Sequence, residues 1–160
     1  MAENKIVIFD LDDTLFDRWG QLDETYKNLP NIQLFPDTIP VLKSIKFPKI
    51  LVTFGDSAIQ KKKIDILGIQ HYFTEIYIFN SLEEKKEYFQ CLMKKYYIKT
   101  PKNVFVVGDR LDSEIRFGKE LGFVTIRLLH GKYKDLKPKD VFELPDYTIE
   151  KISDVLRIVT

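Results

Sequence analysis

The stretch "KIVIFDLDDTLF", residues 5–16, joins a short apolar run to three carboxylates that follow it directly. The run is rich in β-branched residues and its apolar residues are continuous, which predicts a strand covered on both faces. Asp10, Asp12 and Asp13 stand at the carboxyl end of this strand. Two desolvated carboxylates held together repel each other, so folding alone does not favour the arrangement. A bound cation or a proton-transfer task would favour it.

The same kind of run recurs along the chain. Strands are expected at residues 5–9, 49–53, 75–79, 103–107 and 123–129, with helix-like segments between them. Strands that alternate with helices are typical of a parallel sheet built from βαβ units. The predicted fold class is therefore α/β.

The helices have recognisable ends. Ser81 and Glu84 have the spacing of a capping box, which predicts a helix that begins there and lasts to about Tyr97. Gly68 and Gly122 follow helix-like segments, at points where a helix would stop.

The remaining segments complete the expected organisation. A helix is predicted over residues 37–45, and a short helix without a strand within residues 16–35. Residues 130–148 are expected to be mostly loop, and residues 149–159 to form a closing helix.

Composition excludes several classes of protein. The chain has 160 residues, of which 44% are hydrophobic, enough for one domain with a core and too few for two. Its net charge of +1 gives no overall attraction to nucleic acid or to a membrane surface. No apolar run approaches a membrane span, and "MAENK" has no signal-peptide character, which predicts a cytoplasmic protein. Cys91 stands alone, so disulfides and cysteine metal sites are excluded.

A second predicted strand also ends in acid, because Gly108 and Asp109 follow the run "NVFVV". Ligands of open parallel sheets bind beyond the carboxyl ends of the strands. Asp10 and Asp12 point to one side while the chain stays extended, and Asp13 points away. Three carboxylate oxygens with water suit Mg²⁺. The alternative is a loop of solvated acids with Asp13 as a turn residue.

Four motifs in order resemble the haloacid dehalogenase-like (HAD) superfamily, whose members are mostly Mg²⁺-dependent phosphatases. They are "DLDDT" (10–14), "LVTFGD" (51–56), a lysine before the fourth strand, and "VVGDRLDSE" (106–114). The segments "QKKKIDILG" and "LGFVTIRL" also match the family's flanking pattern. The resemblance implies a single Rossmann-like domain over residues 1–160, with a five-stranded parallel sheet in the order 5-4-1-2-3. It also implies that residues 16–35 are a very small cap insert after the first strand.

The resemblance assigns roles to the acids. Asp10 would be the nucleophile that forms an aspartyl-phosphate, and Asp12 the acid that protonates the leaving oxygen and then deprotonates water. Mg²⁺ would be held by the carboxylates of Asp10 and Asp109 and by the backbone carbonyl of Asp12. Thr14 would order the loop that holds Asp12.

The second motif would bind the phosphate group. The hydroxyl of Thr53 and the backbone N–H groups of Phe54 and Gly55 would contact phosphate oxygens. The alternative is an ordinary strand-to-helix turn with Asp56 or Ser57 as the N-cap.

The lysine is either Lys85 or Lys86. An inward stripe is formed by Phe89, Leu92, Met93 and Tyr96. Lys85 lies closer than Lys86 to the centre of this stripe on the helical wheel, and the K-x-x-x-F spacing of relatives also selects Lys85 as the catalytic, phosphate-binding residue.

Glu114 stands where relatives usually carry an aspartate. Its longer side chain predicts a hydrogen bond to a metal-bound water rather than direct coordination. Asp112 is expected to cap the next helix, and Arg110 to contact substrate or to balance local acids.

Three other features are predicted to have no catalytic role. The run "KKK", residues 61–63, is interpreted as helix surface, with Lys63 snorkelling near the apolar stripe. His71 and His130 have no ligand-like spacing and are assigned surface or loop positions.

The predicted function is a small Mg²⁺-dependent phosphohydrolase that acts on a phosphomonoester, either a small molecule or a larger phosphorylated substrate. A signalling receiver domain also phosphorylates an aspartate, but its acceptor lies on the third strand, and here that strand ends "IYIFNS" without one. The remaining alternative is the same fold acting as a non-catalytic binding or regulatory protein.

Overall fold

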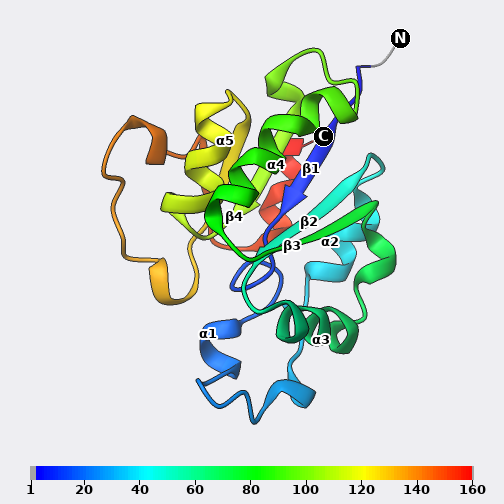
Figure 1. Ribbon diagram of the computed structural model, residues 1–160, viewed down its shortest axis with the longest axis vertical. Helices are drawn as coiled ribbons and strands as arrows, with labels where there is room; N and C mark the ends of the chain where they lie inside the picture. The colour runs from blue at the N-terminus through cyan, green and yellow to red at the C-terminus, as the bar shows by residue number, and fades with distance from the viewer. Residues whose placement is uncertain (1–2, 160) are drawn as a thin grey trace.

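A parallel sheet organises the chain in the computed structural model, which describes residues 3–159 (Figure 1). The strand order is β3-β2-β1-β4-β5-β6, and every neighbouring pair is parallel. The strands are β1 (Ile6–Phe9), β2 (Lys49–Phe54), β3 (Glu75–Phe79), β4 (Val104–Gly108), β5 (Val124–Leu128) and β6 (Tyr147–Ile149). The predicted order of the first five strands is confirmed, and β1 and β4 are neighbours as expected.

The sixth strand was not predicted. β6 begins within residues 130–148, which we expected to be mostly loop, and ends at Ile149, the first residue of the predicted closing helix. It pairs with β5 through Arg127↔Thr148 and Leu128↔Ile149. It has three residues, of which only Ile149 is buried, so no apolar run marks it. The predicted closing helix over residues 149–159 is correspondingly shorter: a 3₁₀ turn (Ile152–Val155) leads into α6 (Leu156–Val159).

Helices cover both faces of the sheet (Figure 1). The helices on the two faces are α2 (Thr38–Ser44), α3 (Ser57–Leu67), α4 (Leu82–Lys95), α5 (Arg116–Glu120) and α6, whereas α1 (Arg18–Gln21) lies beyond the strand ends. Successive residues of β1 enter two different cores, because side chains of a strand alternate between its faces. Val7 and Phe9 pack in the core that α2, α3 and α6 cover, whereas Ile6 and Ile8 pack in the core that α4 and α5 cover. This double burial explains the continuously apolar strand sequences.

Two predicted helix ends are confirmed. The Ser81 side chain accepts a hydrogen bond from the Glu84 backbone N–H at the start of α4. Gly68 ends α3 in the left-handed conformation, with φ 65°, which suits a residue without Cβ.

Residues 16–35 lie beyond the carboxyl end of β1 (Figure 1). They hold α1 and a 3₁₀ turn, Leu29–Asn31, and Phe16 forms isolated bridges with Asp12 and Leu34. The expected short helix is thus a single turn. Among residues 3–159, none of the helices combines the length and the apolar character needed to span a bilayer.

Candidate active site

Acids from β1 and β4 meet at the carboxyl edge of the sheet. Asp10 directly follows β1, and its backbone N–H donates to Val107 O on β4 at 3.0 Å. Asp109 directly follows β4. Asp10, Asp109 and Glu114 each place one carboxylate oxygen within 4.8 Å of the others. Such an all-oxygen set suits a hard divalent cation, and it is the donor set that Mg²⁺ prefers.

The pKa values of Asp10 and Asp109 in this cluster are raised. Burial, followed by the nearby charge of Glu114, raises the pKa of Asp10 to about 8, although the charge of Lys85 opposes the shift. Burial and then the charge of Asp10 also raise the pKa of Asp109 well above its ordinary value. A bound cation would relieve the repulsion among these desolvated carboxylates.

Lys85 lies inside the site. Its ammonium group donates to Glu114 Oε2 at 2.8 Å and to Ser113 Oγ at 3.0 Å, and its side chain is buried. Although burial opposes both effects, the Lys85–Glu114 attraction raises the pKa of Lys85 and lowers the pKa of Glu114. Lys86 instead points to Glu120, with 3.5 Å between Nζ and Oε2, and its side chain is 40% exposed.

Gly108 makes room for Glu114. A Cβ at residue 108 would lie 2.2 Å from Glu114 Cγ, so a side chain there would displace the glutamate. The Arg110 backbone N–H fixes Glu114 further by donating to Oε1 at 3.1 Å. The Arg110 guanidinium pairs with Asp112 through two hydrogen bonds, so Asp112 is an ion-pair partner rather than the expected helix cap.

The threonines of the first two motifs are both buried. Thr14 Oγ1 donates to Asp10 Oδ2 at 3.4 Å, so it contacts the predicted nucleophile itself. Thr53 Oγ1 accepts a hydrogen bond from Gln60. The Gly55 backbone N–H, predicted to bind phosphate, already donates to Phe79 O at 3.1 Å. Asp56 is the N-cap of α3, accepting from Ile59 N.

Two residues of α3 were not predicted to belong to the site. Lys63 Nζ lies 2.8 Å from Asp12 Oδ1, and Gln60 Nε2 lies 3.0 Å from Asp12 Oδ2. The interpretation of Lys63 as a snorkelling surface residue was wrong, because its ammonium group is buried and paired. The position of Lys63 near the apolar stripe of its helix was the only sequence signal that it could be buried. Its partner, Asp12, lies too far away in the sequence to be identified.

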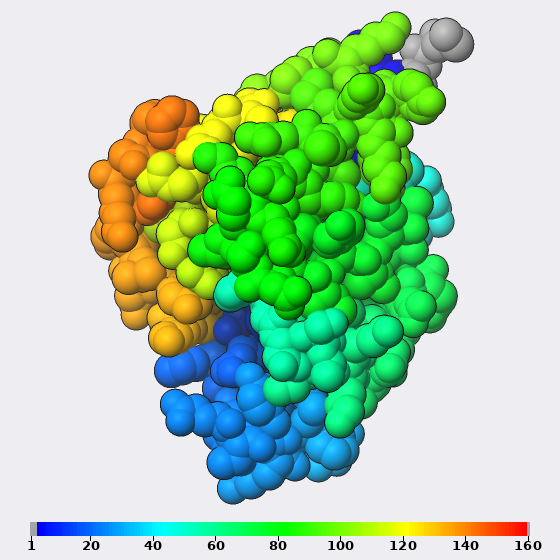
Figure 2. Space-filling view, in the orientation of Figure 1, coloured from blue at the N-terminus to red at the C-terminus, as the bar shows by residue number. Residues whose placement is uncertain are grey.

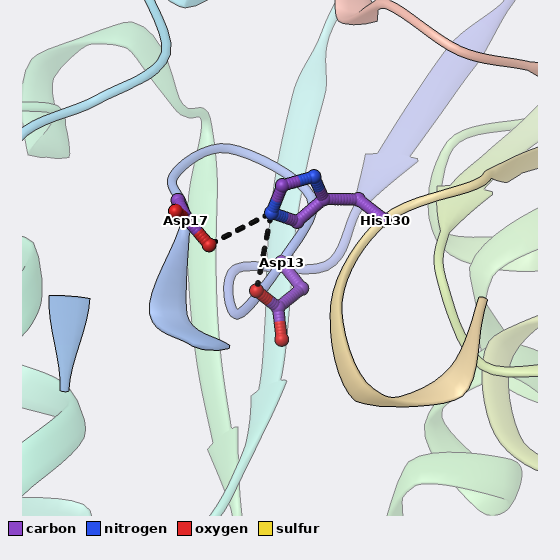
Figure 3. A group of neighbouring side chains, drawn as sticks. All are labelled: Asp13, Asp17 and His130. Carbon is purple, nitrogen blue, oxygen red and sulfur yellow. Dashed lines mark hydrogen bonds and ion pairs between the residues drawn. The ribbon is translucent and has the colours of Figure 1, made fainter. Parts of the chain in front are cut away.

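His130 joins the segment after β5 to residues 16–35 (Figure 3). Its Nε2 lies 2.8 Å from Asp17 Oδ1 and 3.8 Å from Asp13 Oδ1. The Asp13 carboxylate also accepts from the Trp19 backbone N–H at 2.9 Å. Gly131 packs against this carboxylate so closely that a Cβ there would lie 2.6 Å from Asp13 Cγ. His130 does occupy a loop, but sequence spacing could not reveal its distant partners.

These elements enclose a cavity of about 540 Å³. In Figure 2 the recess opens between the blue surface of residues 16–35, the orange surface after β5 and the green surface of the middle of the chain. Its lining includes the carboxylates and Lys85, the cations Arg18, Arg110 and Lys132, and the aromatic residues Trp19, Phe54 and Tyr133. The volume lies within the range of small-molecule sites.

The fold is an open parallel sheet with a cluster of acids at its carboxyl edge. The chain belongs to the family of haloacid dehalogenase-like hydrolases, which it matches over residues 18–122.

Curated relatives are named phosphatases. The chain is 34% identical over 131 residues to the glyceraldehyde 3-phosphate phosphatase of Methanopyrus kandleri, covering 78% of this chain and 56% of that protein. It is 31% identical over 126 residues to the phosphoglycolate phosphatase of Aquifex aeolicus, covering 78% and 56%. The chain thus spans little more than half the length of these relatives.

Solved structures share the fold. A predicted phosphoglycolate phosphatase from Haemophilus somnus 129PT superimposes with a TM-score of 0.81 at 20% identity, covering all of both chains. The HAD hydrolase YfnB of Bacillus subtilis, described as bound to magnesium, gives a TM-score of 0.75 at 18% identity, covering 99% of this chain and 100% of that one.

Proposed function

We propose that this protein is a Mg²⁺-dependent phosphohydrolase that cleaves a phosphomonoester through an aspartyl-phosphate on Asp10. The observation that carries the proposal is the meeting of Asp10, Asp109 and Glu114 beside the buried Lys85. When ionised, the three carboxylates outnumber the one ammonium, which fits a divalent cation that can in turn bind a phosphate group. The names of the curated relatives support the same class of reaction.

The carboxylates of Asp10 and Asp109 and the backbone carbonyl of Asp12 would hold Mg²⁺, and Glu114 would support it through water. When bound, the cation would neutralise negative charge on the nucleophile and on the phosphate oxygens.

The chain's own residues supply the other functions. Thr14 orients Asp10 by donating to Oδ2, which leaves the other oxygen for attack on phosphorus. Asp12 lines the same cavity and would donate a proton to the leaving oxygen, then accept one from the attacking water. Lys85 would bind a phosphate oxygen.

The second motif would complete the phosphate site. The Thr53 hydroxyl and the Phe54 N–H are the candidate donors that remain, since the Gly55 N–H is donated to Phe79 O. For Gly55 to bind phosphate, this hydrogen bond would have to break.

The substrate we propose is a phosphorylated small molecule, as in the names of the relatives. Residues 16–35 would act as a minimal cap on a single domain, and the cavity that they wall is open enough for larger phosphorylated substrates as well. The protein would act in the cytoplasm, without a nucleic acid or membrane partner.

The test is hydrolysis of 4-nitrophenyl phosphate by the wild type, by Asp10→Asn and by the control Lys86→Met. We expect turnover that requires Mg²⁺, is abolished in Asp10→Asn and is retained in Lys86→Met, whose side chain points to Glu120. Full activity in EDTA would refute the metal assignment. A wild-type protein inactive with every metal and phosphomonoester would favour the alternative, a non-catalytic binding or regulatory protein.

A further inference from the structure

Two buried side chains of α3 contact the carboxylate of Asp12. Lys63 Nζ lies 2.8 Å from Oδ1, and Gln60 Nε2 lies 3.0 Å from Oδ2, so each carboxylate oxygen has its own donor. The Lys63 side chain is 2% exposed, whereas that of Asp12 is 25% exposed. The carboxylate is thus anchored from inside the protein and open toward the cavity that it lines.

Gln60 also links Asp12 to the second motif. The same Nε2 atom lies 2.6 Å from Thr53 Oγ1. The NH₂ group of Gln60 carries two hydrogens, so Nε2 can donate to Asp12 Oδ2 and to Thr53 Oγ1 at the same time. Thr53 Oγ1 therefore accepts from Gln60, and its own hydrogen remains available to donate to another group.

Lys63 is itself fixed by its surroundings. Its ammonium group lies 6.0 Å from the ring centroid of Phe16 and 5.8 Å from that of Tyr26, both in the segment that follows the first motif. The next residue, Ile64, packs in the core beneath the sheet. A buried, packed side chain can hold its partner in one place more firmly than an exposed one.

We propose that Lys63 and Gln60 are positioning residues for the reaction: they hold Asp12 where it can transfer a proton and orient Thr53 toward the phosphate. This inference rests on the proposed function. Neither residue needs to touch substrate. Misplacing an acid by about 1 Å can cost on the order of 10²-fold in rate, so the loss of either contact should be measurable.

The adjacent lysines provide a matched control. Lys61 and Lys62 are exposed on the same helix, and only the third lysine of the run is buried. Lys63→Met removes the charge and keeps a long apolar stem, Lys63→Arg keeps the charge, and Lys62→Met removes a charge at the surface. Asp12 keeps access to water in Lys63→Met, so no buried carboxylate is left without a partner.

The decisive readout is the dependence of rate on the leaving group. 4-Nitrophenolate leaves without protonation, whereas an alkyl phosphate needs an acid. The quantity to compare is kcat/KM, which reports phosphorylation of Asp10 and not the later hydrolysis step that both substrates share. We expect Lys63→Met to lower kcat/KM for the alkyl phosphate about tenfold or more beyond its effect on the aryl phosphate, with Lys63→Arg intermediate and Lys62→Met like the wild type. An equal loss on both substrates would show a merely structural role and overturn the proposal.

Gln60 gives a second test that does not involve a charge. Gln60→Met should show the same leaving-group discrimination and also weaker inhibition by inorganic phosphate, because Thr53 loses its partner. Unchanged phosphate inhibition and unchanged leaving-group dependence would overturn the role of Gln60. Circular dichroism and Tm establish that each variant is folded. If Lys63→Met does not fold, the leaving-group dependence of Lys63→Arg and Gln60→Met tests the proposal instead. A wild type inactive on both substrates would instead refute the proposed function, and this inference with it.

Discussion

The acids of the active site should make the metal-free protein less stable as the pH rises. The pKa of Asp10 is raised from 3.8 to about 8 in the folded protein. Between these values the unfolded chain has lost the proton that the folded protein keeps. The free energy of unfolding then falls with pH by at most about 1.4 kcal/mol per pH unit for each such carboxyl group. Asp109 shifts in the same direction and adds to the effect.

The expected size can be stated for thermal unfolding. For a protein of this length, 1 kcal/mol corresponds to about 2–4 °C in Tm. Tm in EDTA should therefore fall by several degrees between pH 5 and pH 8. Mg²⁺ should raise Tm at pH 8 and reduce the slope, because the cation favours the ionised carboxylates; about 1.4 kcal/mol is expected at tenfold excess over the dissociation constant.

Differential scanning fluorimetry across pH 5–8, with EDTA or with Mg²⁺, measures both effects. Asp10→Asn should flatten the slope in EDTA and raise Tm at pH 8, since it removes a carboxyl that resists ionisation. Asp65→Asn, a change at an exposed acid of α3, is the control. A Tm in EDTA that stays level or rises between pH 5 and pH 8 would refute the electrostatic account of the site. A Tm at pH 8 that does not change when Mg²⁺ is added would refute it as well.

Three further predictions concern individual residues. Asp12→Asn should lower turnover by roughly 10²–10⁴-fold, and should lower it most for alkyl phosphates; an unchanged rate would exclude Asp12 as the acid. Gly108→Ala should cost about 1–3 kcal/mol of stability by overpacking against Glu114 and lower activity as well, and a variant as stable and active as the wild type would show that the close contact is not needed. His130→Ala should loosen residues 16–35, increasing acrylamide quenching of Trp19, the single tryptophan, and raising KM. His71→Ala, at an exposed site, is the control, and equal quenching in both variants would exclude a clamp by His130.

Sequence patterns predicted the parts of the fold that depend on local signals. Strands covered on both faces are continuously apolar, so β1, β2, β4 and β5 could be placed from sequence alone. β3 is an edge strand in which only Phe79 is buried, and its β-branched and aromatic residues were the signal that placed it. The helix ends at Ser81 and Gly68 follow from the hydrogen-bonding and backbone preferences of serine and glycine. β6 was not predicted, because a three-residue edge strand with two exposed residues has no apolar run.

The predictions for the site were limited by contacts between distant parts of the chain. The meeting of Asp10 and Asp109 could be predicted, because the carboxyl ends of neighbouring parallel strands lie at one edge of the sheet. Lys63 could not be matched to Asp12 from sequence, since helical geometry gives the direction of a side chain but not what faces it across the fold. The same holds for His130, whose partners Asp13 and Asp17 lie near the other end of the chain. Composition does not distinguish the buried Lys63 from the exposed Lys61 and Lys62 beside it.

The central claim is that Asp10 becomes phosphorylated, and it can be tested by trapping the intermediate. Asp12→Asn should still accept phosphate from a substrate with a good leaving group but should release it slowly. After incubation of this variant with Mg²⁺ and 4-nitrophenyl phosphate, acid quenching and peptide mass spectrometry should locate one phosphate on Asp10. Phosphate on a serine or histidine, or a stoichiometric phosphorylation that persists in the Asp10→Asn/Asp12→Asn double variant, would contradict the account.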